Sequence, residues 1–206
     1  MDATRGFIMA NPDGITNTAT ELEELVQSYT HNLNLVLKQL NVDDLQKLVN
    51  MLLKLRENRG TLYICGNGGS AGNAVHLAND FTFGINPKGR SMDVEALPAN
   101  TSVITCLGND IGYENIFAHQ VKVKAQEGDI LIVLSGSGNS GNIINAINQA
   151  KEMGVYTVGI LGYDGGKAKP LVDLPFHFDI NDMQISEDTQ VILGHILMKA
   201  LYKELA

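Results

Sequence analysis

Two helical patterns of hydrophobic residues open the chain. From Thr18 to Leu40, and again from Val42 to Arg59, apolar residues return every three or four positions, which predicts two amphipathic helices separated by Asn41. The apolar positions are Leu22, Leu25, Val26, Tyr29, Leu33, Val36 and Leu40, followed by Leu45, Leu48, Leu52 and Leu55. The apolar faces of these helices must pack against another surface. A neighbouring subunit or a helical layer within the same domain would each explain them. Residues 1–17 show no period and are predicted to form a flexible arm.

After Gly60 the pattern changes to short apolar runs that alternate with helical stretches. The runs predict five strands, at 61–65, 92–97, 128–134, 156–161 and 174–180. The first helical stretch follows the loop after the first strand and runs to about Phe83. The others lie at 101–109, 113–125, 140–153 and 186–205. Strands that alternate with helices predict an α/β fold, with a five-stranded parallel sheet flanked by helices on both faces. Ligands bind beyond the carboxyl ends of such strands, so function is expected in the loops that follow them.

Composition narrows the class of protein. The 206 residues suit one domain, and the formal charge of −8, from 15 Lys and Arg against 23 Asp and Glu, argues against a nucleic-acid-binding surface. No apolar run approaches the roughly 20 residues that a membrane span needs. The short run Phe7-Ile8-Met9-Ala10, preceded by Asp2, does not resemble a secretory signal. Cys65 and Cys106 have no metal-site spacing, and we expect a cytoplasmic protein.

Two strand-to-helix junctions are rich in glycine and serine, at residues 65–72 and 134–141. The second contains G-x-G-x-x-G, with Asp164 at the end of the next strand, so a dinucleotide site is one interpretation. Against it, too few residues follow Gly141 to complete a dinucleotide fold, and the loop carries three hydroxyl groups. The alternative to a ligand-binding loop is a purely structural tight turn with Ser140 as helix N-cap.

Hydroxyl groups and backbone N–H groups at a helix N-terminus favour a single phosphate group, because the helix dipole attracts the anion. No Gly-Lys-Ser/Thr follows, which excludes a P-loop. The candidate phosphate-binding residues are Asn67, Gly68, Gly69 and Ser70 in the first loop and Ser135, Gly136, Ser137 and Ser140 in the second.

The second junction resembles the sugar isomerase (SIS) domain, and the wider set of motifs resembles the phosphoheptose isomerases. The motifs that carry this resemblance are Cys65-Gly-Asn-Gly-Gly-Ser70 with His76, Gly108-Asn-Asp-x-Gly-Tyr113 with Ile116-Phe117, Tyr163-Asp-Gly-Gly-Lys167, and His195-Ile-Leu197. The resemblance runs from about residue 20 to the C-terminus and implies a SIS domain over 60–206, with the helices of 18–59 in the same domain and in a subunit interface.

Four polar residues gain a role through this resemblance. By pattern alone, His76 and Asp80 lie on one helix face, where a surface ion pair, a satisfied core histidine or a metal site would each explain them, and His195 among apolar neighbours is a core histidine. The resemblance implies instead that His76, Asp80, Glu187 and His195 bind one zinc ion per subunit, and that Asp80 and His195 do acid–base work. The sequence does not separate ligand from base.

This chain departs from the family pattern at several of these positions. Asp80 stands where the family has Glu, and Glu187 stands where it has Gln, so two neutral histidines and two carboxylates would balance the charge of zinc. An ideal helix separates Glu187 from His195 by about 12 Å, so Glu187 must reach the site from the first helical turn or from another subunit. Gly136 stands where the family usually has Thr, so the identity of the sugar-phosphate substrate stays open.

The expected activity is isomerisation of sedoheptulose 7-phosphate to D-glycero-D-manno-heptose 7-phosphate, the entry to surface heptose biosynthesis. The resemblance further implies a homotetramer with active sites at subunit boundaries, where Asn109 and Asp110 contact the sugar. Two alternatives remain, an isomerase of another sugar phosphate and a non-catalytic scaffold similar to an adaptor that binds the replication initiator. That adaptor lacks the histidine of the last helix, so His195 favours an enzyme.

Overall fold

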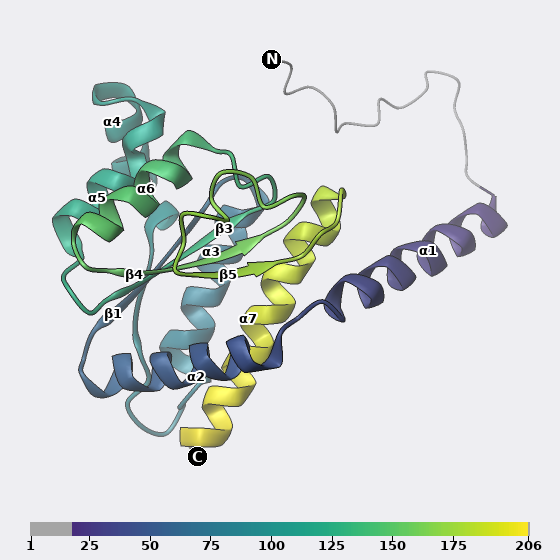
Figure 1. Ribbon diagram of the computed structural model, residues 1–206, viewed down its shortest axis with the longest axis horizontal. Helices are drawn as coiled ribbons and strands as arrows, with labels where there is room; N and C mark the ends of the chain where they lie inside the picture. Colours follow the sequence, from purple (N-terminus) through teal and green to yellow (C-terminus); the bar gives the residue numbers. More distant parts are fainter. Residues whose placement is uncertain (1–17, 206) are drawn as a thin grey trace.

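The computed structural model describes residues 18–205 and contains a five-stranded sheet between two layers of helices (Figure 1). The strand order is β2-β1-β3-β4-β5, and every neighbouring pair is parallel. The strands are β1 (Thr61–Gly66), β2 (Asp93–Ala96), β3 (Ile130–Ser135), β4 (Tyr156–Leu161) and β5 (Leu174–His177). The predicted α/β class and all five predicted strands are therefore confirmed. The predicted arm over residues 1–17 lies outside the described residues.

β3 begins at Ile130, two residues after the predicted start, and two other strands end earlier than predicted. β2 ends at Ala96 because Leu97–Ala99, which contains Pro98, forms a 3-10 helix, and proline cannot donate to a sheet. β5 ends at His177, three residues before the predicted end. Both corrections lie at strand ends, where apolar side chains continue beyond the hydrogen-bonded ladder.

Seven α-helices account for the helical patterns within residues 18–205. They are α1 (Ala19–Leu37), α2 (Val42–Glu57), α3 (Gly69–Asn79), α4 (Thr101–Asp110), α5 (Ile116–Lys124), α6 (Gly141–Glu152) and α7 (Met183–Leu205). The Thr18 hydroxyl and the Glu21 carboxylate form a capping box at α1, and the Asn41 side chain caps α2. The break predicted at Asn41 therefore has a direct cause, because this side chain accepts hydrogen bonds from the first turn of the next helix.

Four helix predictions need correction. The first helix ends at Leu37, three residues before the predicted Leu40. The helix expected to run to Phe83 is α3 followed by a π-helical turn, Asp80–Gly84. The helix expected over 113–125 is a 3-10 turn, Tyr113–Asn115, followed by α5. The last helix begins at Met183, three residues before the predicted Ser186. This earlier start places Glu187 in the second turn of α7 and not in the first.

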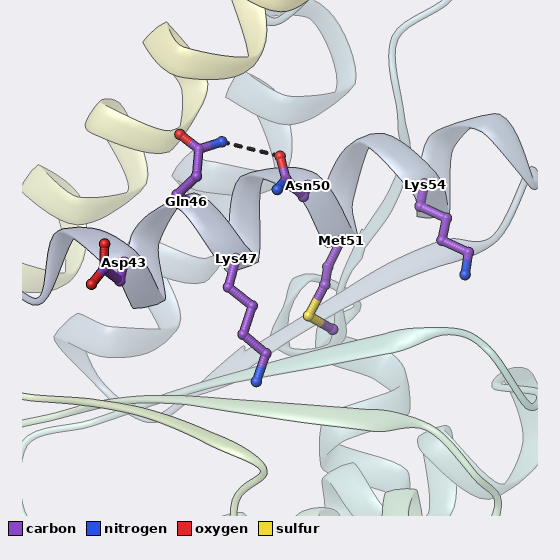
Figure 2. Close-up of a pocket in the computed structure, with 6 residues that line it drawn as sticks. All are labelled: Asp43, Gln46, Lys47, Asn50, Met51 and Lys54. Atoms are coloured by element: carbon purple, nitrogen blue, oxygen red, sulfur yellow. Dashed lines mark hydrogen bonds between the residues drawn. The ribbon is translucent and has the colours of Figure 1, made fainter.

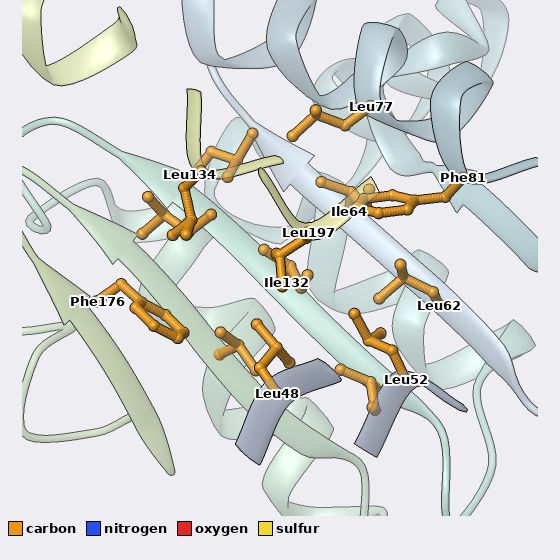
Figure 3. Close-up of a cluster of buried hydrophobic side chains, with 14 of the residues drawn as sticks. Leu48, Leu52, Leu62, Ile64, Leu77, Phe81, Ile132, Leu134, Phe176 and Leu197 are labelled. Atoms are coloured by element: carbon orange, nitrogen blue, oxygen red, sulfur yellow. The ribbon is translucent and has the colours of Figure 1, made fainter. Parts of the chain in front are cut away.

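Each face of the sheet has its own hydrophobic core. On one face, α2, α3 and α7 contribute leucines that pack on β1 and β3, and Figure 3 shows Leu52, Leu77 and Leu197 gathered over Ile64 and neighbouring side chains of the sheet. On the other face, α5 and α6 cover the alternate side chains, among them Cys65 of β1. Because β1 and β3 are buried on both faces, their sequences contain continuous apolar runs with no alternation, 62–65 in β1 and 130–134 in β3.

Helix α1 is an exception to this packing. It projects away from the rest of the structure (Figure 1), and Val36 is its one buried residue. Leu22, Leu25 and Val26 are 48–61% exposed. The Tyr29 hydroxyl donates a hydrogen bond of 2.6 Å to the Asp188 carboxylate of α7. No helix within residues 18–205 is both long enough and apolar enough to cross a membrane.

Candidate active site

His76, Asp80 and His195 converge at one point on the surface formed by α3 and α7. The two imidazole Nε2 atoms are 2.8 Å apart, and the Asp80 Oδ2 atom lies 3.5 Å from His76 Nε2 and 3.3 Å from His195 Nε2. The histidine side chains are 48% and 42% exposed, whereas that of Asp80 is 17% exposed. The cluster therefore combines a half-buried carboxylate with two imidazoles that solvent or a substrate can reach.

The local sequence explains why these three side chains meet. His76 and Asp80 are four residues apart, and the start of the π-helical turn at Asp80 keeps them on one side. Gly194, beside His195, lets α7 approach α3 closely, because a Cβ atom there would lie 2.2 Å from Leu77 Cδ2. The predicted pairing of His76 with Asp80 is thus confirmed, and the structure adds His195 to it across 119 residues.

Glu187 lies apart from this cluster. Among residues 18–205, the group of ligand atoms within 4.8 Å of one another contains His76, Asp80 and His195 and does not contain Glu187. The Glu187 carboxylate lies instead against the start of α3, where a Cβ atom on Gly69 would be 2.3 Å from Glu187 Oε2. Burial and the neighbouring Asp188 carboxylate raise the pKa of Glu187. The structure therefore brings together three of the four expected ligands and places the fourth beside the first glycine loop.

The first loop follows β1 and leads into α3. Gly68 has a φ angle of 56°, which favours glycine, and Ser70 is buried in the first turn. The Asn67 and Asn142 side-chain amides hydrogen-bond to each other at 2.8 and 2.9 Å, and the Tyr113 hydroxyl donates to Asn67 Oδ1 at 2.9 Å. This network fixes Asn67 between α6 and the turn at Tyr113.

The second loop follows β3, the strand next to β1. The Ser135 hydroxyl accepts a hydrogen bond from the Gly138 N–H at 3.0 Å, and the Ser137 hydroxyl accepts one from the Asn139 N–H at 3.2 Å. Ser140 occupies the N-cap position of α6, but its side chain makes no capping bond, so the plain N-cap interpretation has no support in this geometry. The expected phosphate-binding residues thus lie at the carboxyl ends of two adjacent strands.

Glycines bring a third loop against the second. A Cβ atom on Gly138 would lie 2.1 Å from the Gly165 carbonyl oxygen, and one on Gly166 would lie 2.4 Å from the Ser137 carbonyl oxygen. Beside this crossing lies a hollow of about 370 Å³ whose walls include Ser137, Tyr163 and Asp164. Asp164 therefore borders the loop from outside, and its own carboxylate accepts a hydrogen bond from the Gly166 N–H at 2.9 Å.

Two further features bear on the predicted site. Asn109 and Asp110 lie at the exposed end of α4, where the Asn109 amide donates to the Asp110 carboxylate at 2.7 Å and the Cys106 thiol donates to it at 3.5 Å. That contact raises the pKa of the Cys106 thiol.

A hollow of about 460 Å³ along α2 (Figure 2) is lined by Lys47, Met51 and neighbouring residues and contains no predicted site residue.

Sequence reasoning missed three residues that shape the site. The Asn73 amide donates to the Glu187 carbonyl oxygen and to Gln190 Oε1, both at 3.0 Å, and so ties α3 to α7. Met183 fills the space beside Gly136, where a Cβ atom would lie 2.6 Å from the Met183 Sδ atom. Asn142 completes the Asn67 network. The only sequence signal for any of them is position, since Asn73 and Asn142 fall in the helices that follow the two loops.

The family comparisons agree with this architecture. The SIS domain family model matches residues 28–162. Phosphoheptose isomerases of Clostridium acetobutylicum and Helicobacter pylori are 38% and 37% identical to this chain over 164 and 158 residues. These matches cover 80% and 77% of this chain and 84% and 82% of the relatives. The solved phosphoheptose isomerase of Neisseria gonorrhoeae is 28% identical and superimposes with a TM-score of 0.80, covering 87% of this chain and 98% of that one.

A parallel five-stranded sheet with glycine and serine loops at its carboxyl edge, together with that family match, makes this a SIS-domain protein. The extent and identity of the curated relatives define it further. The chain belongs to the phosphoheptose isomerase family.

Proposed function

We propose that this chain interconverts sedoheptulose 7-phosphate and D-glycero-D-manno-heptose 7-phosphate for surface heptose biosynthesis. Phosphoheptose isomerases are aldose–ketose isomerases, and their reaction moves a proton between C1 and C2 of the sugar. The observation that carries the proposal is the convergence of His76, Asp80 and His195 near two loops suited to a phosphate group. Such a reaction needs a base at carbon, a proton shuttle between two oxygens and stabilisation of an oxyanion.

The spacing of the two parts supports a long sugar phosphate. Gly69 begins α3 at the first loop, and His76 lies seven residues further on, or about 10 Å along the helix axis. A phosphate group held at the loops would therefore place the far end of an extended seven-carbon chain near the cluster. Purified protein should convert sedoheptulose 7-phosphate, which a coupled or chromatographic assay detects. Turnover of a different sugar phosphate alone would assign this chain another substrate. No turnover of any sugar phosphate would favour the non-catalytic scaffold.

The cluster also fits a divalent metal ion. Two imidazole nitrogens and a carboxylate oxygen within 4.8 Å of one another form the mixed donor set that zinc binds in catalytic sites. We propose that His76, Asp80 and His195 hold one zinc ion per subunit, with Glu187 as the fourth ligand or as a substrate contact. When bound, zinc would polarise the substrate oxygens. In its absence Asp80 and His195 would form a plain acid–base pair, because Asp80 Oδ2 lies 3.3 Å from His195 Nε2.

Ser137→Ala is expected to raise KM with little change in kcat. In the proposed cradle, Ser70, Ser135, Ser137 and Ser140 with the backbone of 67–69 bind the phosphate, far from the reacting carbons. Loss of one hydrogen bond to a charged group costs about 1.5–3 kcal/mol, or roughly 10- to 100-fold in affinity. Steady-state kinetics measures the change, and equal binding of the phosphorylated and phosphate-free sugar would exclude the cradle.

We further propose a homotetramer that acts in the cytoplasm, with Asn109 and Asp110 reaching the sugar bound to a neighbouring subunit. The exposed Leu22, Leu25 and Val26 of α1 support this assembly, because a projecting amphipathic helix gains stability by covering its apolar face. Light scattering should return about 89 kDa, which is four times 22.3 kDa. A mass near that of one chain would refute both the tetramer and the shared site.

A further inference from the structure

Three arginines surround one hollow at the edge of the sheet opposite the glycine and serine loops. The hollow measures about 410 Å³, and its walls include Arg56, Arg59 and Arg90. Gly60 and Asp93 on the same wall lie at the starts of β1 and β2, whereas the phosphate loops follow the ends of the strands. These are all the arginines within residues 18–205. A chain with a formal charge of −8 therefore places three of its four guanidinium groups around one hollow.

Backbone contacts hold two of these guanidinium groups in position. Arg56 donates from Nε and Nη2 to the Arg90 carbonyl oxygen at 2.9 and 2.5 Å, and Arg90 Nη2 donates to the Arg56 carbonyl oxygen at 2.6 Å. A guanidinium group has five N–H donors, so most of the donors of this pair remain free for another acceptor. Carbonyl oxygens fix the groups but leave their positive charge uncompensated.

Within residues 18–205, Arg56, Arg59 and Arg90 form no ion pair with Asp or Glu. Asp93, the single acidic residue of the wall, accepts a hydrogen bond from the Thr61 hydroxyl at 3.0 Å. The wall as a whole therefore carries two net positive charges, and like charges held close together attract an anion.

Helix energetics alone does not explain the arrangement. The C-terminal turn of α2 favours the positive charge of Arg56. Arg59, however, lies beyond the C-cap Asn58 with a φ angle of 60°, a position that glycine usually takes because other side chains are strained there. Arg90 lies outside any helix. The strained arginine at 59 points to a use for its side chain.

We propose that this hollow is a second anion site, which binds a small molecule carrying two linked phosphate groups, such as a nucleoside diphosphate. The planar fork of a guanidinium group matches phosphate oxygens, and the volume suits a small ligand. Because the three groups come from separate positions around the hollow, two linked phosphates engage more of them than one phosphate can. This site is independent of the proposed sugar-phosphate cradle at the other edge of the sheet.

Calorimetric titration with inorganic pyrophosphate at near-physiological ionic strength tests the proposal. Arg59→Gln is the first variant, because among residues 18–205 the Arg59 guanidinium donates no hydrogen bond that the fold would lose. It should weaken pyrophosphate binding about tenfold, as loss of one charged hydrogen-bonding group does. Arg90→Gln should weaken it as well, and orthophosphate should bind the unchanged protein more weakly than pyrophosphate.

Lys54→Gln is the matched control, since it removes one positive charge from the last turn of α2, five residues before Arg59, at a residue outside the hollow. It should leave the affinity within about twofold of the original. Several results would overturn the proposal: no saturable binding to the unchanged protein, unchanged affinity in Arg59→Gln, or an equal loss in Lys54→Gln. Binding that is lost in Ser137→Ala and kept in the arginine variants would assign pyrophosphate to the cradle and also overturn it.

Discussion

His195→Ala and His76→Ala are each expected to abolish bound metal and isomerase activity while the fold remains intact. Each change removes one of three donors that lie within 4.8 Å of one another, so the remaining pair would hold a metal ion weakly. Activity should fall by about 10³-fold or more, in the range of lost acid–base or metal catalysis. The fold should survive because the side chains of His195 and His76 are 42% and 48% exposed and bury little apolar surface. Elemental analysis, kinetics and thermal unfolding measure the three effects.

Two other variants make this result specific. His119→Ala removes an exposed histidine of α5 outside the cluster and should leave metal content and activity unchanged. Glu187→Gln should keep the metal, with somewhat weaker affinity if Glu187 is a ligand, because one negative charge is lost. Full activity after exhaustive chelation, with no metal detected, would exclude the zinc proposal and leave Asp80 and His195 as an acid–base pair.

The sequence was sufficient to predict the fold because its three interior strands are buried on both faces. The run Ile130–Leu134 is apolar at every position, and a loop of serine and glycine begins directly after it at Ser135. The sequence therefore indicates both the strand and the start of α6. The first turns of α1 and α2 were equally clear, since Thr18 and Asn41 are capping residues. Local chemistry determined these elements, and local patterns therefore predicted them.

The site was less predictable because its geometry depends on contacts between distant segments. The pairing of His76 with Asp80 follows from helical spacing, but the position of His195 depends on Gly194 packing against Leu77. Glu187 was expected at the metal cluster, and its carboxylate lies instead beside Gly69. The π-helical turn at Asp80 and the earlier start of α7 were also missed. No local pattern encodes these distances, which arise from tertiary packing.

The crossing of two loops at Gly138 leads to the second large expected effect. Gly138→Ala should destabilise the protein by about 3 kcal/mol or more, because it adds a strained backbone conformation and a steric clash. Gly138 has a φ angle of 63°, and a Cβ atom there would lie 2.1 Å from the Gly165 carbonyl oxygen. The obstacle is backbone, so neither loop can yield by rotating a side chain.

The same change should impair the proposed phosphate cradle. Displacement of Gly138 would break the hydrogen bond from its N–H to the Ser135 hydroxyl, now 3.0 Å long, and would move Ser137 with it. We therefore expect KM to rise more than in Ser137→Ala, which removes one hydroxyl from an otherwise intact loop. Steady-state kinetics at a temperature where both variants are folded compares the two values of KM.

Gly128→Ala separates backbone strain from steric clash. Gly128 has a φ angle of 91°, but no atom lies within 4 Å of a Cβ built there. It precedes β3, at the amino-terminal end of the strand, whereas the phosphate loops follow the carboxyl ends. The substitution should therefore lower the free energy of unfolding by only about 1 kcal/mol and leave KM unchanged. Thermal unfolding at one fixed protein concentration measures the difference between the variants. Equal loss of stability in Gly128→Ala and Gly138→Ala would show that the loop at Gly138 can move away from Gly165, and that the close crossing of the two loops does not hold the cradle in place.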